Sequence, residues 1–597
     1  MTQTDRPNTD LPDDNPALLD EDQADENLAA RRDLGTEIAP NPLRDRFGSA
    51  LDEDLGPVSK KSAALSGVLA AALALGVGEL LSGFSNQIPS LVARVGDVVI
   101  ENVPGSVERW AISTFGENDK PALVIGITVI SLLLGAITGI VSRKRPDAAW
   151  VVFGAFGVIG GLAAGSDPQR SQLLGWIAAA VAAVVGVVAL KLLLRAARNA
   201  TAAAEADVDI ADPTAANRRG FLGAASAAAA LGVATPLVGR SLRNRRLAQT
   251  EADRELVASA IEARPQAEPT DFSSEIADRV SAQGTLIGDN FDDVDGITPV
   301  VVPNDEFYRI DTALVIPQLD VNTWSMKVTG MVDNEIELTF DDLLNMDPVE
   351  EYVTMSCVSN PIGGELVGNA RWLGVPIKKV LDMAGVQAGA DQIVGRSVDG
   401  WTGGFPTEYL DDPDRVALIA VAMNGEPLPV QHGFPVRLVV AGLYGYVSAT
   451  KWLAEIELTT FDDFEGFWIP RGWSALGPVK TQSRIDVPRA NSQIAPGPQV
   501  IAGIAWAPDR GIARVEVQTV EIVDGEPIEG PWIDADLSAD VTDNSWRQWR
   551  VDWDAPFGDF AIRVRATDNA GDTQTEIRSR VDPDGATGWH TIAIRVA

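Results

Sequence analysis

The chain has 597 residues, of which 84 are acidic and 48 are basic, and its formal net charge is -36. This excess of negative charge argues against a nucleic acid partner, because binding of phosphates needs a basic surface. The single cysteine excludes an intramolecular disulfide and an iron–sulfur cluster, and the two histidines exclude most histidine-based metal sites. A chain of this length predicts several domains.

The acidic, Asp- and Pro-rich sequence of residues 1–57 predicts a disordered cytoplasmic tail. Residues 58–200 contain four apolar runs, each close to the roughly 20 residues that span a bilayer. These runs are 62–84, 121–141, 148–165 and 173–194. Basic residues before the first run and after the second and fourth all fall on the cytoplasmic side of such a domain. We therefore predict a four-span helical domain in the lipid bilayer.

The four apolar runs contain no histidine, so we expect no haem b in the membrane domain. A structural anchor is the simplest interpretation of these spans. A docking platform for a redox partner is the alternative.

Residues 201–246 contain a pair of arginines, Arg218 and Arg219, followed by Phe221-Leu222 and an apolar run to residue 238. Two arginines, one spacer and an apolar pair resemble the twin-arginine export signal, which exports folded proteins. An ordinary fifth span with cytoplasmic arginines is the alternative. In both cases we expect residues 221–238 to remain as a membrane anchor, followed by a polar linker over residues 247–297.

The only cysteine, Cys357, follows a predicted strand end at residues 353–355 and begins a loop rich in Gly and Asn. A loop of small residues lets the backbone approach a large ligand closely. From composition alone the thiol can be an inert buried group, an exposed thiol, a nucleophile or a single thiolate ligand to a metal.

Five motifs between residues 298 and 484 resemble the sulfite-oxidase family of molybdopterin enzymes, in a membrane-anchored, actinobacterial-like bacterial form. They are residues 304–309, 368–375, 394–406, 424–438 and 442–453. The resemblance implies an α+β catalytic domain with one molybdenum and one pterin, and no haem or iron–sulfur cluster. It also implies that Cys357 is the catalytic metal ligand.

The pterin of that family ends in a phosphate, and a buried phosphate needs a guanidinium, an ammonium and further donors. Residues of matching chemistry lie in the motifs. The expected cofactor-binding set is Asn304, Tyr308, Arg309, Ser397, His432, Arg437, Ser448, Thr450 and Lys451.

The sequence departs from the sulfite oxidases at three substrate positions. Ile310 stands where they carry an arginine, Pro361 and Ile362 replace arginines after the cysteine, and Phe464 replaces a tyrosine. A dianion such as sulfite would enter without cationic partners. We therefore expect a neutral or weakly polar substrate, either a small molecule or a side chain, as in the family's methionine-sulfoxide reductase branch.

Residues 485–597 contain about seven short alternating strands, among them 500–505, 513–520, 546–552 and 560–568. This region resembles the family's immunoglobulin-like dimerisation domain, which implies a β-sandwich and a homodimer. We expect the second histidine, His590, to have a structural role.

Together these patterns predict a multi-pass plasma-membrane oxidoreductase with its catalytic domain on the extracytoplasmic side. It would transfer oxygen atoms in the reductase direction and exchange electrons with a separate partner. The alternative is a non-catalytic cell-surface binding module built on a sulfite-oxidase-like fold.

Overall fold

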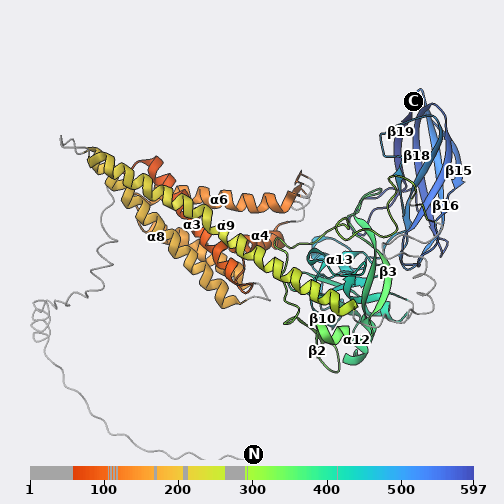
Figure 1. The fold of residues 1–597 in the computed structure, drawn as a ribbon, viewed down its shortest axis with the longest axis horizontal. Helices are drawn as coiled ribbons and strands as arrows, with labels where there is room; N and C mark the ends of the chain where they lie inside the picture. The colour runs from red at the N-terminus through yellow and green to blue at the C-terminus, as the bar shows by residue number, and fades with distance from the viewer. Residues whose placement is uncertain are drawn as a thin grey trace, which may run out of the picture. The chain divides into compact units, whose positions relative to one another are not determined.

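The computed structural model describes residues 58–104, 118–166, 171–205, 213–262, 290–291, 293–412 and 415–597, with isolated positions from 107 to 115 (Figure 1). The expected tail at residues 1–57 lies outside the described residues. So do parts of the expected cytoplasmic loop and linker, at residues 206–212 and 263–289.

Among the described residues, five helices are long and apolar enough to cross a membrane. They are α3 (Lys60–Phe84), α6 (Asp119–Ser142), α7 (Ala148–Gly165), α8 (Gln172–Glu205) and α9 (Pro213–Glu262). Small residues let them approach closely: a Cβ added to Gly67 of α3 would lie 1.9 Å from the carbonyl oxygen of Gly135 on α6. A shorter helix, α4 (Leu91–Asn102), follows α3.

Helix α9 differs from the expected anchor of residues 221–238, because it continues to Glu262 through residues that we expected to be linker. Tertiary contacts explain the extension. Arg254 donates to the carbonyl of Pro427 at 2.9 Å, and the side chain of Val257 is buried in the core of the next domain. The last turns of α9 therefore belong structurally to the region that follows the membrane helices.

Two sheets form the framework of residues 298–484. One has the order β2-β1-β10-β5-β6, and the other has the order β3-β4-β7-β8, with β9 also paired to β7. The strands of the first sheet are β1 (Ser325–Gly330), β2 (Ile336–Thr339), β5 (Gln392–Ser397), β6 (Thr402–Pro406) and β10 (Leu453–Thr459). Those of the second are β3 (Val349–Ser356), β4 (Val367–Pro376), β7 (Ala417–Met423), β8 (Glu426–Pro427) and β9 (Arg437–Val440).

Short helices connect these strands. They are α11 (Phe340–Leu344), α12 (Ile377–Ala384), α13 (Gly445–Ser448), η2 (Thr407–Leu410), η3 (Val430–His432) and η4 (Ile469–Arg471). Both sheets share one apolar core, in which Trp372 and Phe405 are among the largest fully buried side chains. The expected strand end before Cys357 is confirmed, since β3 ends at Ser356.

The C-terminal region contains two further sheets, with the orders β11-β13-β17-β16 and β12-β19-β18-β14-β15. Their strands are β11 (Gln482–Val487), β12 (Gln493–Ile494), β13 (Gly497–Trp506), β14 (Ile512–Val523), β15 (Glu526–Asp534), β16 (Asp536–Leu537), β17 (Arg547–Ala555), β18 (Gly558–Asp568) and β19 (His590–Val596). Apolar side chains from both sheets share one core. The expected strands are present, and the expected boundary after Arg484 falls inside β11.

Candidate active site

The thiol of Cys357 is held at the start of a compact loop, residues 357–366, which we call the thiol loop. The backbone N–H of Cys357 donates to the carbonyl of Leu366 at 2.9 Å, and the carbonyl of Cys357 accepts from the N–H of Asn360 at 3.0 Å. The Asn360 side chain accepts from the N–H of Leu366 at 3.0 Å. These bonds close the loop where strands β3 and β4 end, so the direction of Cys357 is set by two paired strands.

Neutral hydroxyl groups surround the thiol. The Cys357 Sγ lies 2.9 Å from the Ser359 Oγ. Burial raises the pKa of Cys357, and hydrogen bonds with Ser359 oppose that rise. Burial and the neighbouring Cys357 raise the pKa of Tyr308, while burial raises the pKa of Tyr444 to about 12. Both phenols therefore stay protonated at neutral pH.

Arg437, the first residue of β9, is a buried cation, with 5% of its surface exposed. Its guanidinium donates to the carbonyls of His432 at 3.1 Å and Leu438 at 3.3 Å, and it lies 5.1 Å from the ring centre of Trp372. Burial lowers the pKa of Arg437 to about 10. Within the described part of the chain, no carboxylate forms an ion pair with it. A buried guanidinium without a counter-anion is costly, so its surroundings fit an anionic ligand.

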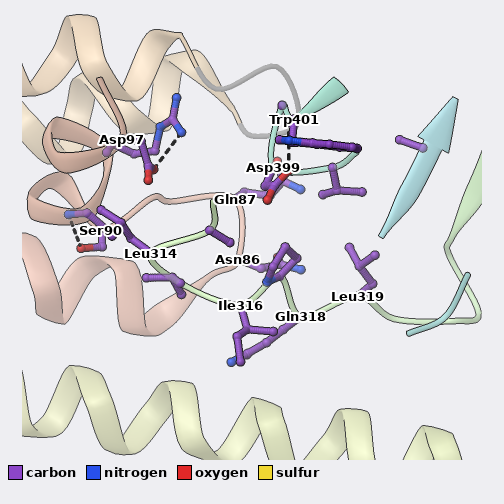
Figure 2. Close-up of a pocket in the computed structure, with 18 of the residues that line it drawn as sticks. Asn86, Gln87, Ser90, Asp97, Leu314, Ile316, Gln318, Leu319, Asp399 and Trp401 are labelled. Carbon is purple, nitrogen blue, oxygen red and sulfur yellow. Dashed lines mark hydrogen bonds and ion pairs between the residues drawn. The ribbon is translucent and has the colours of Figure 1, made fainter. Parts of the chain in front are cut away.

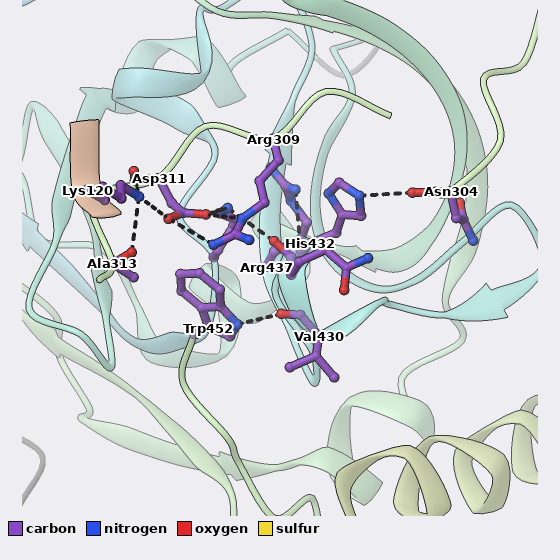
Figure 3. A network of polar contacts seen from close by, with 11 residues as sticks. Lys120, Asn304, Arg309, Asp311, Ala313, Val430, His432, Arg437 and Trp452 are labelled. Carbon is purple, nitrogen blue, oxygen red and sulfur yellow. Dashed lines mark hydrogen bonds and ion pairs between the residues drawn. The ribbon is translucent and has the colours of Figure 1, made fainter. Parts of the chain in front are cut away.

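His432 ends the short helix η3 and is neutral. Its Nε2 lies 3.0 Å from the carbonyl oxygen of Asn304 and donates to it, which leaves Nδ1 as an acceptor (Figure 3). Burial, followed by the nearby Arg437 and Lys451, lowers the pKa of His432 to about 4. The side chain of Asn304 is itself bonded to Asn424 at 2.8 Å. Donation from His432 to a phosphate would therefore require protonation of Nδ1.

A carboxylate that the sequence analysis missed, Asp311, joins several cations into one network (Figure 3). Asp311 lies 2.7 Å from Lys451 Nζ, 2.8 Å from Arg309 Nε and 2.9 Å from Lys120 Nζ. Burial by itself would raise the pKa of Asp311, but the cations outweigh it and hold that pKa well below its usual value. Burial lowers the pKa of Lys451 to about 8 despite Asp311.

We call Arg309, Asp311, Arg437, Lys451 and Lys120 the cationic cluster. Three of its four cations pair with the one ionised carboxylate, and Arg437 has no carboxylate partner among the described residues, so the cluster keeps an excess of positive charge. That excess matches a ligand with two negative charges.

Comparison with known proteins agrees with this chemistry. Residues 313–468 match the family model described as "Oxidoreductase molybdopterin binding domain". The "Uncharacterized oxidoreductase YuiH" of Bacillus subtilis is 35% identical over 159 residues, which cover 26% of this chain and 76% of that protein. The chain belongs to the sulfite-oxidase family of molybdopterin-dependent oxidoreductases.

Other members of the family are more distant. Human mitochondrial sulfite oxidase is 25% identical over 342 residues, which cover 50% of this chain and 62% of that enzyme. The NADH nitrate reductase of Solanum lycopersicum is 30% identical over 171 residues, which cover 24% of this chain and 19% of that enzyme. The chain thus spans about three-fifths of the length of the sulfite oxidases that it matches. Membership of this oxidoreductase family indicates an enzyme.

The residues present fit a molybdenum–molybdopterin cofactor. Cys357 supplies a soft sulfur ligand at one end of the site. Arg437, with no carboxylate partner among the described residues, suits the phosphate at the other. The ring of Tyr308 stacks on Phe307, which packs edge-on against His432. Hydrogen bonds connect Asn304, His432 and Arg437, and Asp311 pairs with both Arg309 and Lys451. The role of Cys357 as the metal ligand stays a prediction.

The three expected hydroxyl donors differ in whether the hydroxyl group already has a hydrogen-bond partner. Ser448 Oγ donates to the carbonyl of Tyr444 at 3.1 Å, and Ser397 Oγ accepts from the N–H of Asp399 at 3.4 Å. Thr450 Oγ1 is fully buried without a hydrogen-bond partner and lies against Gly395 of β5. Thr450 therefore retains a free hydroxyl, whereas Ser448 already satisfies its hydroxyl within its own turn.

Two uncharged residues that replace sulfite oxidase substrate groups each lie next to an arginine, Ile310 in sequence and Phe464 in space. Ile310 is 49% exposed. The ring of Phe464 lies 4.6 Å from the guanidinium carbon of Arg396, which is itself ion-paired with Glu457. Neither residue brings a positive charge to the thiol loop.

A cavity of about 620 Å³ lies beside the segment that follows Asp311 (Figure 2). Its lining includes Asn86, Gln87, Leu314, Asp399 and Trp401, but not Cys357. The Trp401 N–H donates to Asp399 at 3.1 Å, and burial raises the pKa of Asp399. Asp399 interacts electrostatically with Asp311 and Lys451, so this cavity adjoins the cationic cluster rather than the thiol loop.

Proposed function

We propose that this enzyme reduces a neutral or weakly polar oxide, such as a sulfoxide or an N-oxide, and does not oxidise sulfite. The observation that carries the proposal is the separation of charge within one site. The unneutralised positive charge lies in the cationic cluster, around Arg437. The thiol loop, where a substrate would meet the metal, is lined by neutral groups such as Ser359.

Cations near the thiol loop have carboxylate partners of their own. Arg484, which donates to the carbonyl of Gly364 at 2.9 Å, is paired with Asp486 at 2.6 Å. Lys480, next to Tyr444, is paired with Asp584 at 3.1 Å. A dianionic substrate would have to break such pairs or remain uncompensated, at a cost of several kcal/mol. A neutral oxide has no such requirement.

The chain's own residues would hold the cofactor, orient the substrate and donate hydrogen bonds. The bound cofactor supplies two-electron oxygen-atom transfer. Reduction of a neutral oxide X=O consumes two electrons and two protons and yields X and water. Tyr308 and Tyr444 keep their protons at neutral pH, so both remain hydrogen-bond donors beside Cys357. With the cofactor bound, Arg437 and Lys451 would hold its phosphate.

We also propose that the five apolar helices anchor the enzyme in the plasma membrane, with the catalytic domain on the extracytoplasmic side and a separate electron donor. The proposal is supported by their length and composition. Arg218 and Arg219 would direct export, so replacing both with Lys should leave the catalytic domain protected from external protease. An unchanged outside location would contradict the export role.

The C-terminal two-sheet region would correspond to the family's immunoglobulin-like dimerisation domain, and its two sheets around a shared core support this assignment. Light scattering of the detergent-solubilised enzyme would test the homodimer. A mass equal to one chain plus detergent would contradict it.

The substrate proposal is tested with the full chain, purified in detergent from a host that makes the cofactor. A panel of sulfoxides and N-oxides is supplied with a chemical electron donor, and sulfite is supplied with a chemical electron acceptor. Turnover of at least one neutral oxide is expected, with no sulfite oxidation above the level of Cys357→Ser. Sulfite oxidation that depends on Cys357 would overturn the proposal.

A further inference from the structure

The strand that delivers Cys357 is an edge strand in its own sheet. In the order β3-β4-β7-β8, one side of β3 pairs with β4, and no strand among the described residues pairs with the other side. Residues of the C-terminal region cover this open side. The Thr354 N–H donates to the carbonyl of Asn544 at 2.9 Å, and the Trp546 N–H donates to Thr354 Oγ1 at 2.7 Å. These bonds lie three residues before the cysteine.

The thiol loop is held by the same region on its other side. Arg484 donates to the carbonyl of Gly364 at 2.9 Å and to Thr298 Oγ1 at 2.6 Å. Gly363 has a φ of +75° and lies under the imidazole of His590, because a Cβ added there would be 2.3 Å from the ring atoms Cδ2 and Nε2. His590 is the first residue of β19, more than two hundred residues away in sequence.

The imidazole of His590 is itself fixed by the fold. Its Nδ1 accepts the backbone N–H of Ile485 in β11 at 2.9 Å. Burial lowers the pKa of His590 to about 4, so the ring is neutral at physiological pH and carries its proton on Nε2. A ring whose orientation is set by one strand therefore lies directly against Gly363 of the thiol loop.

We propose that the C-terminal two-sheet region is part of the catalytic site, and that His590 is a positioning residue that fixes Cys357 through Gly363. Gly363 and Gly364 have the greatest backbone freedom in the thiol loop, and these are the residues that His590 and Arg484 contact. A metal ligand needs a fixed direction, which supporting residues supply. This inference rests on the proposed function only in taking Cys357 as the metal ligand.

The test uses the fact that Cys357 is the only cysteine in the chain. Alkylation of the cofactor-free full chain in detergent therefore reports on one thiol and does not depend on turnover. In the wild type the partly buried thiol, which Ser359 contacts, should react slowly. Loss of the ring in His590→Ala should speed alkylation by at least about tenfold, because the loop opens more often.

Two conservative variants separate the contacts of the imidazole. His590→Phe keeps a ring against Gly363 but loses the bond to Ile485, and it should retain slow alkylation. His590→Asn keeps an acceptor for Ile485 but has no ring, and it should react as fast as His590→Ala. Arg595→Ala is the matched control, because Arg595 lies on the same strand and pairs only with the exposed Asp559.

Electron paramagnetic resonance of the molybdenum-loaded, partly reduced enzyme gives a second readout. The spectrum depends on the orientation of the thiolate ligand, so it should shift in His590→Ala and His590→Asn but not in Arg595→Ala. Equal alkylation rates in His590→Ala, His590→Asn and wild type would overturn the proposal. Fast alkylation of His590→Phe would also overturn it, because it would assign the protection to the Ile485 bond alone. None of these outcomes depends on which substrate is reduced.

Discussion

The cationic cluster and the thiol loop are two halves of the candidate site, and they differ in charge: the first is positive, and the second surrounds a neutral thiol. In the cationic cluster, burial acts on Arg437 and Lys451, and positive charge exceeds the single carboxylate of Asp311. In the thiol loop, burial acts on a neutral thiol whose main partner is Ser359. This difference in charge indicates different tasks: one half retains an anion, and the other admits a substrate.

One of the two histidines lies next to each half, and the two are alike. Burial lowers the pKa of both His432 and His590 to about 4, and one ring nitrogen of each is hydrogen-bonded to a backbone group. The histidines therefore do not distinguish the two halves. The guanidinium of Arg437 does, and the variants below change one half at a time.

The largest expected effect is loss of the cofactor on Arg437→Ala. Removing two charge-assisted bonds, each worth ~1.5–3 kcal/mol, should weaken cofactor binding by roughly 10²- to 10⁴-fold. Molybdenum content by elemental analysis and released pterin by fluorescence measure the loss. Arg396→Ala is the control, because Arg396 is paired with Glu457 away from the site. Full cofactor content in Arg437→Ala would contradict the assignment of phosphate binding to the cationic cluster.

Cys357→Ser should have the opposite effect: it should lower turnover and leave the cofactor bound. A serine oxygen is a harder, poorer electron donor than a thiolate, so turnover should fall to below about a thousandth of wild type, a barrier increase of about 4 kcal/mol. Molybdenum content should stay near wild type, because the cationic cluster is intact. Turnover and metal content are measured on the same preparation. Near-native activity would show that Cys357 is not the metal ligand.

A smaller effect is expected in the pH dependence of stability. The unfolded chain protonates His432 near its ordinary pKa of 6.5, whereas the folded chain does so only near 4. As pH falls through this window the unfolded state binds the proton first, so stability falls, by up to about 3 kcal/mol for this histidine. The apparent midpoint of thermal unfolding of the cofactor-free protein should therefore decrease from pH 7 to pH 4.5.

His432→Gln is the matched variant for that measurement, because a glutamine amide can still donate to Asn304 but does not titrate. It should flatten the decrease. Cofactor loading should flatten it too, since a phosphate beside His432 favours the protonated imidazole, while the contribution of His590 should be unchanged. An identical pH profile in His432→Gln would contradict a neutral, buried His432.

The smallest change is expected from Phe464→Tyr, which restores the tyrosine of the sulfite oxidases. No sulfite oxidation should appear, because the ring lies against Arg396 and the thiol loop still lacks an unpaired cation. Steady-state assays with sulfite and a chemical acceptor measure it. Sulfite turnover in this single variant would show that charge does not set the substrate class.

Local sequence patterns predicted the end of β3 before Cys357, the C-terminal strands and the apolar helices, because each depends on residues adjacent in the chain. The family resemblance selected Arg309 and Lys451, which both pair with Asp311, and His432 and Arg437, which the structure brings into contact. The cofactor family is shown, whereas the substrate, the export signal and the dimer stay predictions.

Features that depend on distant residues were missed. Asp311 followed Arg309 by two positions in a recognised motif, which was an available signal, but its partner Lys451 lies 140 residues away. Helix α9 was expected to end at residue 238, since nothing local shows that Val257 is buried against another domain. His590 was expected to be structural, and its contact with Gly363 arises only when β11 and β19 come together.

The open edge of β3 has a consequence for the solubility of fragments. A protein cut after Arg484 would keep every cofactor-binding residue but would lose the residues around Asn544 that cover Thr354. Uncovered edge strands pair with other chains, and such pairing leads to aggregation. The sequence pattern changes near residue 484, but a fragment that ends there is therefore not expected to be soluble. The full chain in detergent should be monodisperse, whereas a chain that ends at Arg484 should precipitate.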